Sequence, residues 1–257
     1  MKNVLVTGAN GQLGKSIQKI QRNYRYLNFD FFDSNQLDIT NSECVSSAFA
    51  KKKYHYCINC AAYTSVEKAE KYPENAFAVN AEGVKKLSET CLKYETILIH
   101  ISTDYVFDGE KETGYLPSDT PNPINEYGKS KLQGEHYIQE ILKKYFIIRT
   151  SWLYSEFGKN FYKTIMAKAV AGEDLYITDE QIGCPTNANN LAVYLCQLIT
   201  ETKSDFGIHH FTDRKAMSWY GFAQRILEEH DFKDKVKLDK AQNYRTFAKR
   251  PRNTILS

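Results

Sequence analysis

Apolar and polar residues alternate along the first 150 residues in blocks that predict strands and helices in turn. Short apolar runs occur at residues 2–7, 26–32, 56–59, 97–101 and 146–150. Runs of this length are typical of strands buried on both faces of a parallel sheet. Between them, apolar residues recur at helical spacing, as at 76, 79, 84, 87 and 91, which predicts a helix over residues 75–94. The alternation predicts an α/β fold, a doubly wound parallel sheet of Rossmann type with right-handed crossovers.

After residue 152 this rhythm loosens. The pattern predicts helices near residues 160–172, 189–200 and 218–230, with short strands near 175 and 207–211. We therefore expect a dinucleotide-binding domain over residues 1–150, to which segments around 187–211 return. Residues 151–257 are expected to form a smaller, partly interwoven substrate-binding lobe.

Composition narrows the class of protein. With 257 residues, 42% hydrophobic and 25% charged, the chain reads as an ordinary globular protein. The net charge of +3 is small and the basic residues are scattered, so we expect no nucleic-acid partner. The longest apolar stretch, residues 191–199, is too short to span a bilayer, so we expect no membrane partner. Six cysteines without disulfide-like spacing and no apolar leader favour a cytoplasmic location. Cys57 and Cys60 have the spacing of a redox or zinc pair, but no second pair exists and they lie within an apolar strand pattern, so we expect no metal site.

A glycine-rich turn joins the first strand to the first helix. In Gly8-Ala-Asn-Gly-Gln-Leu-Gly14, glycines permit a tight turn, close approach of a pyrophosphate and close helix packing. The helix N-terminus would face the phosphates. Asp33 follows about twenty residues later, the spacing of a ribose-binding carboxylate, although it could also be a turn residue. A carboxylate there repels a 2′-phosphate, which mildly favours NAD over NADP.

The central strand and the helix that follows carry the candidate chemistry. The apolar run 97–101 breaks into Ser102 and Thr103 at the carboxyl edge of the sheet, where ligands bind in this fold. Tyr127 and Lys131 lie one helical turn apart on one face. An ammonium and a nicotinamide cation near the phenol would favour its phenolate, and Thr103 could bind the carbonyl oxygen that Tyr127 protonates. The set predicts ketone reduction by hydride transfer.

Other residues admit two interpretations at this stage. Ala61 and Ala62 could let a flat cofactor lie against the main chain, or serve tight packing alone. Asn80, a polar residue within a helix, could fix a neighbouring strand or loop. Trp152 could carry a sugar or base on its flat face, although a tryptophan is more often part of the core. Arg250, in a basic cluster near the end of the chain, could contact phosphate or be solvated.

Motifs along the whole chain resemble the extended short-chain dehydrogenase/reductases and, within them, the dTDP-4-dehydrorhamnose reductase family. They are TGANGQLG at 7–14, LDIT at 37–40, NCAAYT at 59–64, STDYVFDG at 102–109, YGKSKL at 127–132, RTSW at 149–152, QIGCPT at 181–186 and RPRNT at 250–254. The resemblance implies NADPH- or NADH-dependent reduction of the C4 ketone of a nucleotide sugar, dTDP-4-dehydro-6-deoxy-L-mannose (dTDP-4-dehydrorhamnose), to dTDP-L-rhamnose. This reaction serves polysaccharide biosynthesis.

The resemblance and the local patterns together give the predicted site. The catalytic residues are Thr103, Tyr127 and Lys131. The dinucleotide site comprises Gly8, Asn10, Gly11, Gln12, Leu13, Gly14, Asp33, Asp38, Ile39, Ala61, Ala62, Tyr63, Asn80 and Ser102, together with Tyr127 and Lys131. The substrate site comprises Thr103, Asp104, Tyr105, Trp152 and Arg250.

Two departures and two alternatives stay open. Some family members are described as dimerising through magnesium held partly by a carboxylate on the first helix, where this chain has Lys15 and Ser16, so a homodimer is allowed but no magnesium site is expected. The chain stops at Ser257, before the further helix usual in the family, so its lobe could be truncated. One alternative is another epimerase, dehydratase or reductase of the same fold that acts on sugar nucleotides. The other is a non-catalytic regulatory subunit that binds a dinucleotide.

Overall fold

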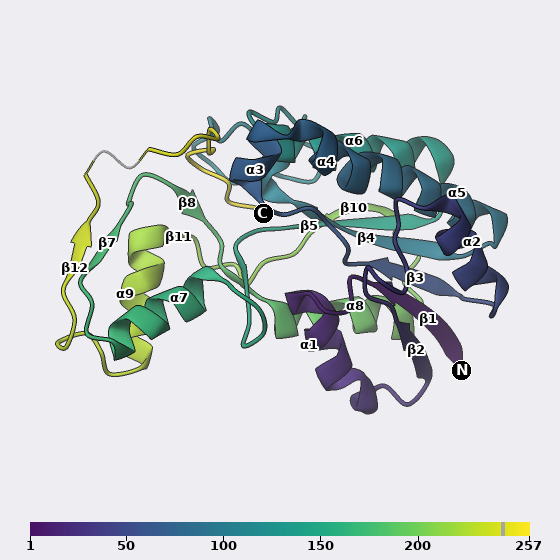
Figure 1. Cartoon of the computed structure of the whole chain (residues 1–257), viewed down its shortest axis with the longest axis horizontal. Coiled ribbons are helices and arrows are strands. Elements are labelled where there is room, and N and C mark those ends of the chain that lie inside the picture. Colours follow the sequence, from purple (N-terminus) through teal and green to yellow (C-terminus); the bar gives the residue numbers. More distant parts are fainter. Residues whose placement is uncertain (243–244) are drawn as a thin grey trace.

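A six-stranded parallel sheet forms the centre of the computed structural model, which describes residues 1–242 and 245–257 (Figure 1). Its strand order is β10-β5-β4-β3-β1-β2. The strands are β1 (Lys2–Thr7), β2 (Leu27–Phe31), β3 (Tyr56–Asn59), β4 (Ile97–Thr103), β5 (Tyr145–Thr150) and β10 (Gly207–His210). Every neighbouring pair is parallel. The predicted fold class is confirmed.

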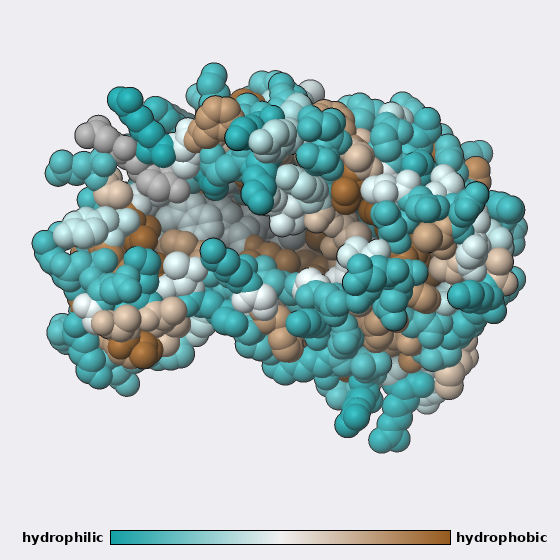
Figure 2. Space-filling model, viewed as in Figure 1, coloured by the Kyte–Doolittle hydropathy of each residue, from teal (hydrophilic) through white to brown (hydrophobic). Residues whose placement is uncertain are grey.

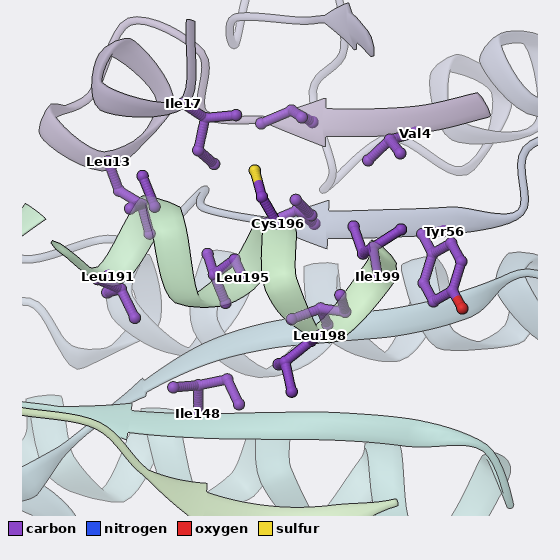
Figure 3. Close-up of a cluster of buried hydrophobic side chains, with 14 of the residues drawn as sticks. Val4, Leu13, Ile17, Tyr56, Ile148, Leu191, Leu195, Cys196, Leu198 and Ile199 are labelled. Carbon is purple, nitrogen blue, oxygen red and sulfur yellow. The ribbon is translucent and has the colours of Figure 1, made fainter. Parts of the chain in front are cut away.

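Helices cover both faces of this sheet (Figure 1). On one face lie α1 (Gln12–Ile20) and α8 (Ala188–Thr200). On the other lie α2 (Ser42–Ala50), α5 (Val84–Lys93) and α6 (Glu126–Ile141). Because successive side chains of a strand point to opposite faces, Val4 and Val6 pack into the first layer while Leu5 packs into the second. Figure 3 shows the first layer, where Leu13 and Ile17 of α1 meet the apolar side of α8.

The segment between β3 and β4 differs from the single helix expected over residues 75–94. It consists of α3 (Val66–Lys71), α4 (Pro73–Phe77), a π-helical turn η2 (Ala78–Gly83) and then α5. The π-helical turn coincides with a wider apolar spacing, because five residues separate Val79 from Val84 where three or four separate the other apolar positions. The 3₁₀ turns η1 (Gln21–Asn23) and η3 (Asp104–Val106) follow α1 and β4.

The lobe has its own apolar core, built around α7 (Phe161–Val170) and α9 (Trp219–Glu229). The predicted helices near 160–172 and 218–230 correspond to these two. Short strands complete the lobe: β7 (Leu175–Ile177) pairs with β12 (Leu238–Lys240), β8 (Ile182–Gly183) with β11 (Met217–Ser218), and β6 (Leu153–Tyr154) with β9 (Thr186–Asn187). Strands of two residues leave no alternation to read, and most of these were not predicted.

The chain crosses back to the sheet after entering the lobe, because α8 packs on α1 and β10 pairs with β5. The site between sheet and lobe is therefore built from both. Within the described residues, none of the helices combines the length and apolar character needed to cross a membrane.

Candidate active site

Two adjoining cavities open at the carboxyl ends of the parallel strands. The larger, of about 480 Å³, lies between the sheet edge and the lobe, and the second, of about 370 Å³, continues toward the end of β2. Asn10, Gly11, Cys60 and Ala62 line both. Figure 2 shows the molecule hollowed between the part that carries α7 and α9 and the sheet layer. This is the place where open α/β sheets bind ligands.

Most of the predicted site residues line these cavities. Around the larger are Asn10, Gly11, Gln12, Leu13, Gly14, Ala62, Ser102, Thr103, Asp104, Tyr127, Lys131 and Trp152. Around the second are Gly8, Asn10, Gly11, Asp33, Asp38, Ile39, Ala61, Ala62 and Tyr63. Asn80, Tyr105 and Arg250 line neither.

The glycine turn has the form that a pyrophosphate requires. Gly8 has φ +63, and a Cβ there would lie 2.7 Å from Ala61 N. A Cβ on Gly14 would lie 2.6 Å from Gly8 O. Helix α1 begins after Gly11 without a side-chain cap, so its first N–H groups are left to the cavity that Gly11 and Gln12 line. Uncapped N–H groups at a helix start are an anion site, and the residues present fit a dinucleotide.

Two carboxylates border the second cavity. Asp33 accepts hydrogen bonds from Asn10 Nδ2 at 2.8 Å and from Asn35 N at 3.0 Å, which fixes its orientation on the rim. Asp38 accepts from the main-chain N of Thr40 at 2.9 Å and from its hydroxyl at 2.8 Å. Among the described residues, those that line this cavity include no lysine or arginine. The negative charge here therefore suits the 2′-hydroxyl of a ribose better than the 2′-phosphate of NADP.

Asn80 lies behind the cavity wall, on the π-helical turn η2. Its Oδ1 accepts from Tyr63 N at 2.8 Å, and its Nδ2 donates to Tyr63 O and to Ser130 Oγ, both at 3.0 Å. This matches the interpretation that it fixes a neighbouring segment. Its membership of the dinucleotide site stays a prediction, and any such effect would act through the Tyr63 main chain.

The start of α6 places Tyr127 against the end of β4. Asn125 caps the helix by accepting from Gly128 N at 2.8 Å. A Cβ on Gly128 would lie 2.1 Å from Tyr105 O, so only glycine lets the helix approach η3 this closely. The Tyr127 ring meets the Tyr105 ring edge to face, with centroids 5.8 Å apart. Tyr127 and Thr103 therefore border the same cavity, and their catalytic roles stay a prediction.

The pKa of Tyr127 differs from the expectation of a favoured phenolate. Burial raises the pKa of this phenol well above its usual value; the Thr103 hydroxyl lowers it, and Asp104 and Tyr105 raise it further. The neighbouring ammonium does not offset this, because Lys131 Nζ is engaged on β4, at 2.7 Å from Ile101 O and 3.1 Å from His100 Nε2. The protein's own groups thus keep Tyr127 protonated.

Lys131 is itself buried. Burial lowers its pKa to about 8, while the carboxylate of Glu135 and the thiol of Cys60 raise it. Glu135 in turn pairs with Arg149: their side chains are 0% and 1% exposed, with Arg149 Nη2 at 2.6 Å from Glu135 Oε2. The Ser102 hydroxyl donates to Glu135 Oε1. Sequence reasoning missed this pair, although Arg149 lies in the motif RTSW and Glu135 follows Lys131 by one turn on α6.

Three of the residues predicted to bind substrate line the larger cavity at the end of β4 and the start of the lobe. Burial raises the pKa of Asp104 to about 6, against hydrogen bonds from Thr254 and Thr103 that lower it. Trp152 lines the cavity with φ 48 and stacks on Trp219, ring centroids 3.5 Å apart and planes 5° apart. Thr150, Ser151, Gly158 and Lys159 also line it and were not predicted. Gly158 and Lys159 lie in a loop without a recognisable pattern.

Tyr105 and Arg250 lie outside the cavity lining but contact each other. Arg250 Nη1 donates to Tyr105 Oη at 3.3 Å, and Nη2 donates to Glu67 Oε1 at 2.9 Å. Glu67 also accepts from the main-chain N of Phe247 and Ala248 at 3.0 and 3.1 Å. The basic segment near the end of the chain is thereby fastened to α3 beside the site. A direct substrate contact for either residue stays a prediction.

Comparison with known proteins gives a consistent result over the whole chain. The family model described as the RmlD substrate binding domain matches residues 1–257. A dTDP-4-dehydrorhamnose reductase of Aggregatibacter actinomycetemcomitans is 39% identical, the match covering 100% of this chain and 90% of that protein. A crystal structure of a dTDP-4-dehydrorhamnose reductase from Bacillus anthracis in complex with NADP superimposes with a TM-score of 0.95 at 38% identity, covering 100% of this chain and 91% of the other.

More distant structures share the fold alone. A UDP-glucose 4-epimerase of Thermus thermophilus in complex with NAD superimposes with a TM-score of 0.80 at 21% identity, covering 99% of this chain and 90% of the other. The match of the family model to all 257 residues, with relatives above 30% identity along the full chain, confirms the resemblance drawn from the motifs. The chain belongs to the dTDP-4-dehydrorhamnose reductase family.

Proposed function

We propose that this protein reduces the C4 ketone of dTDP-4-dehydrorhamnose to dTDP-L-rhamnose, with NADPH or NADH as hydride donor. One observation carries the proposal most directly. Thr103, Tyr127 and Lys131 border the same cavity as the glycine turn Gly11–Gly14, in a chain whose close relatives are reductases of this substrate. When bound, the dinucleotide supplies the hydride.

The chain's own residues supply the proton and orient the ketone. Tyr127 is protonated at neutral pH because burial raises its pKa, so it can donate its proton to the ketone oxygen as negative charge develops there. Thr103, beside it at the end of β4, offers a hydroxyl to the same oxygen. Its Oγ1 accepts from Tyr105 N at 3.2 Å and donates to Asp104 Oδ1 at 3.1 Å, so the hydroxyl proton must turn from Asp104 to the ketone oxygen when substrate binds.

The two cavities suggest how the ligands divide. The dinucleotide would run from the second cavity, past the N-terminus of α1, into the larger one. The sugar nucleotide would then lie toward Trp152 and Lys159, where an aromatic face and an exposed ammonium suit a sugar ring and a diphosphate. Because Asp33 and Asp38 border the ribose end, we propose that NADH is used at least as well as NADPH. The structure of the Bacillus anthracis relative is a complex with NADP, so the assay below compares both cofactors.

The decisive experiment offers the purified protein dTDP-, UDP- and GDP-linked 4-keto-6-deoxy sugars with NADH or NADPH. We expect dTDP-L-rhamnose as product, identified by chromatography and NMR, with stoichiometric oxidation of the nicotinamide. A sugar epimerised at constant nicotinamide, together with NAD retained through purification, would instead identify an epimerase. Dinucleotide binding without conversion of any sugar would favour a regulatory subunit.

Paired tyrosine variants test the proton donor. Tyr127→Phe should leave dinucleotide binding nearly unchanged and lower reduction at least about a hundredfold, the scale of a lost general acid. Tyr137→Phe is the matched control, because Tyr137 lies on the same helix but its hydroxyl contacts Glu82 outside the cavity. Full activity of the Tyr127 variant would dismiss this assignment.

A further inference from the structure

A row of hydrogen-bonded, buried polar side chains crosses the sheet and ends at Lys131. The mechanism above does not use this row. It starts at Thr7 on β1, passes through Asn59 on β3 and His100 on β4, and ends at Lys131 on α6. The first three are 0% exposed and Lys131 is 1% exposed. Thr7 Oγ1 lies 2.6 Å from Asn59 Oδ1, Asn59 Nδ2 lies 3.0 Å from His100 Nδ1, and His100 Nε2 lies 3.1 Å from Lys131 Nζ.

Hydrogen-bond donors next to Asn59 fix the orientation of its side-chain amide. The main-chain N–H of Ala61, always a donor, points at Asn59 Oδ1 at 3.2 Å, and the Thr7 hydroxyl donates to the same oxygen. Turning the amide over would set its NH₂ against the Ala61 N–H and leave the Thr7 proton without this acceptor. A buried donor left unpaired costs more than a typical hydrogen bond contributes, so Asn59 Nδ2 faces His100.

The Asn59 amide in turn fixes the tautomer of His100. An amide nitrogen only donates, so His100 Nδ1 must accept and carries no proton. Burial, and then the positive charge of Lys131, lower the pKa of His100 well below its usual value, so the ring is neutral and has a single proton. That proton therefore sits on Nε2, the atom that faces Lys131 Nζ.

We propose that His100 is a positioning residue for Lys131, donating its Nε2–H to the amine form of that lysine and disfavouring the ammonium. When Lys131 is protonated, its N–H groups and the His100 Nε2–H are all donors and cannot bond to each other. When Lys131 is neutral, the Nε2–H donates to the lone pair of its Nζ. The importance of this bond for catalysis rests on the proposed function, in which Lys131 is one of the three predicted catalytic residues, but the bond itself does not.

Other groups around Lys131 also affect its protonation equilibrium. Glu135 on the same helix, Cys60 after β3 and the carbonyl of Ile101 on β4 favour the ammonium. Burial opposes it. Tyr127, one turn before Lys131, and Asp104, at the end of β4, both line the cavity that Lys131 reaches, and burial raises the pKa of each. With burial, Glu135 and Cys60 alone the pKa of Lys131 is about 8, and a donor at His100 Nε2 lowers it further.

The tautomer can be read directly in the full-length protein without any substrate. Two-bond ¹H–¹⁵N spectra of ¹⁵N-labelled protein distinguish Nε2–H from Nδ1–H, and His100→Gln assigns the signal among six histidines. We expect the Nε2–H form for His100 at a pH above that at which Lys131 loses its proton. An Nδ1–H form or an imidazolium there would overturn the proposal.

The sign of the effect on Lys131 is the second test. His100→Asn keeps a polar atom near the position of Nδ1 but removes the donor to Lys131, so the Lys131 pKa, followed by the ¹³C shift of its Cε, should rise by about one unit. His136→Asn, on the exposed side of the same helix, should leave it unchanged. If His100 instead accepts from the ammonium, the pKa in His100→Asn falls; a fall or no change refutes the proposal.

Activity then separates the proposal from the proposed function. If Lys131 serves the reduction, the basic limb of the kcat/KM profile moves upward with its pKa in His100→Asn. A merely structural role for His100 would lower yield or thermal stability and leave that limb in place. A protein that reduces none of the sugars would refute the proposed function while the tautomer and the lysine pKa still decide the role of His100.

Discussion

Replacing Glu135 by glutamine removes one charge from the most buried ion pair of the described structure. The glutamine keeps the shape of the side chain but leaves the guanidinium of Arg149 with an uncompensated charge at 1% exposure. In wild type this guanidinium also lies over the Phe107 ring, with Cζ 5.1 Å from the ring centroid. Its Nη1 has no hydrogen-bond partner within the described chain, so no second acceptor can replace the carboxylate.

The expected loss follows from that isolation. Breaking a buried pair by removing one partner costs about 3–5 kcal/mol of unfolding free energy, because the other charge stays buried and unpaired. For a chain of this size each kcal/mol corresponds to about 2–4 °C in Tm, so Tm should fall by roughly 6–20 °C. The Ser102 hydroxyl, which donates to Glu135, can still donate to the glutamine oxygen and should add little.

Urea unfolding followed by tryptophan fluorescence measures this loss, with two comparisons. Lys168→Gln breaks the pair of Lys168 with Glu173, which are 45% and 56% exposed, and should cost less than about 1 kcal/mol. The double variant Glu135→Met, Arg149→Met removes both charges and should recover most of the lost stability. A Glu135→Gln loss no larger than that of Lys168→Gln would refute the argument that burial controls the energy of this pair.

Three further predictions concern single residues. Asp33→Ala should relax the discrimination between NADH and NADPH, measured as the ratio of kcat/KM values; an unchanged ratio would mean that Asp33 does not touch the ribose. Gly134→Ala should destabilise the protein by about 1–3 kcal/mol, because the new Cβ would lie 2.2 Å from Asn80 O. Gly221→Ala in α9 should be neutral or stabilising, because no atom lies closer than 3.5 Å to the new Cβ. Equal denaturation midpoints of the two variants would contradict this prediction. Burial raises the pKa of Asp104 in the folded protein to about 6, so its contribution to stability is present below about pH 4 and is lost as pH rises through 6. Relative to Asp104→Asn, the unfolding free energy of wild type should fall by about 2–3 kcal/mol between those pH values. A stability difference between the two proteins that does not change with pH would exclude the raised pKa.

The sheet was predictable because its strands are continuous apolar runs. The runs at 2–7 and 56–59 coincide with β1 and β3, and their parallel pairing follows from the helices between them. The family, the type of reaction and the cofactor class followed from motifs and are supported by the comparisons. The domain division, the roles of single site residues, a homodimer and a cytoplasmic location stay predictions.

The parts that were missed depend on contacts between distant segments. His100 lies within an apolar run and therefore reads as one more strand residue, although it faces Lys131 of another element. Glu135 and Arg149 belong to α6 and β5, and no spacing links them. The pKa of Tyr127 was expected to be lowered by Lys131, one turn away, and by a nicotinamide cation. The structure contradicts the first cause, because neighbourhood on a helix does not say where a long side chain places its charge, and the second stays a prediction.

Burial acts in opposite directions on the two groups that share one face of α6, and this gives the site its chemical direction. It raises the pKa of the Tyr127 phenol, which keeps the phenol neutral before reaction, and lowers the pKa of Lys131 to about 8, which leaves the ammonium as its main form at neutral pH. A neutral phenol is the form that can give a proton to a ketone oxygen. Once it has done so, a phenolate faces a poorly hydrated pocket, and a positive charge on Lys131 then stabilises it far more than it stabilised the phenol. The attraction between Lys131 and Tyr127 is thus strongest for the negative charge that develops on Tyr127 during reduction. An electrostatic interaction that is stronger in the transition state than in the ground state lowers the barrier, whereas one that is equal in both only strengthens binding.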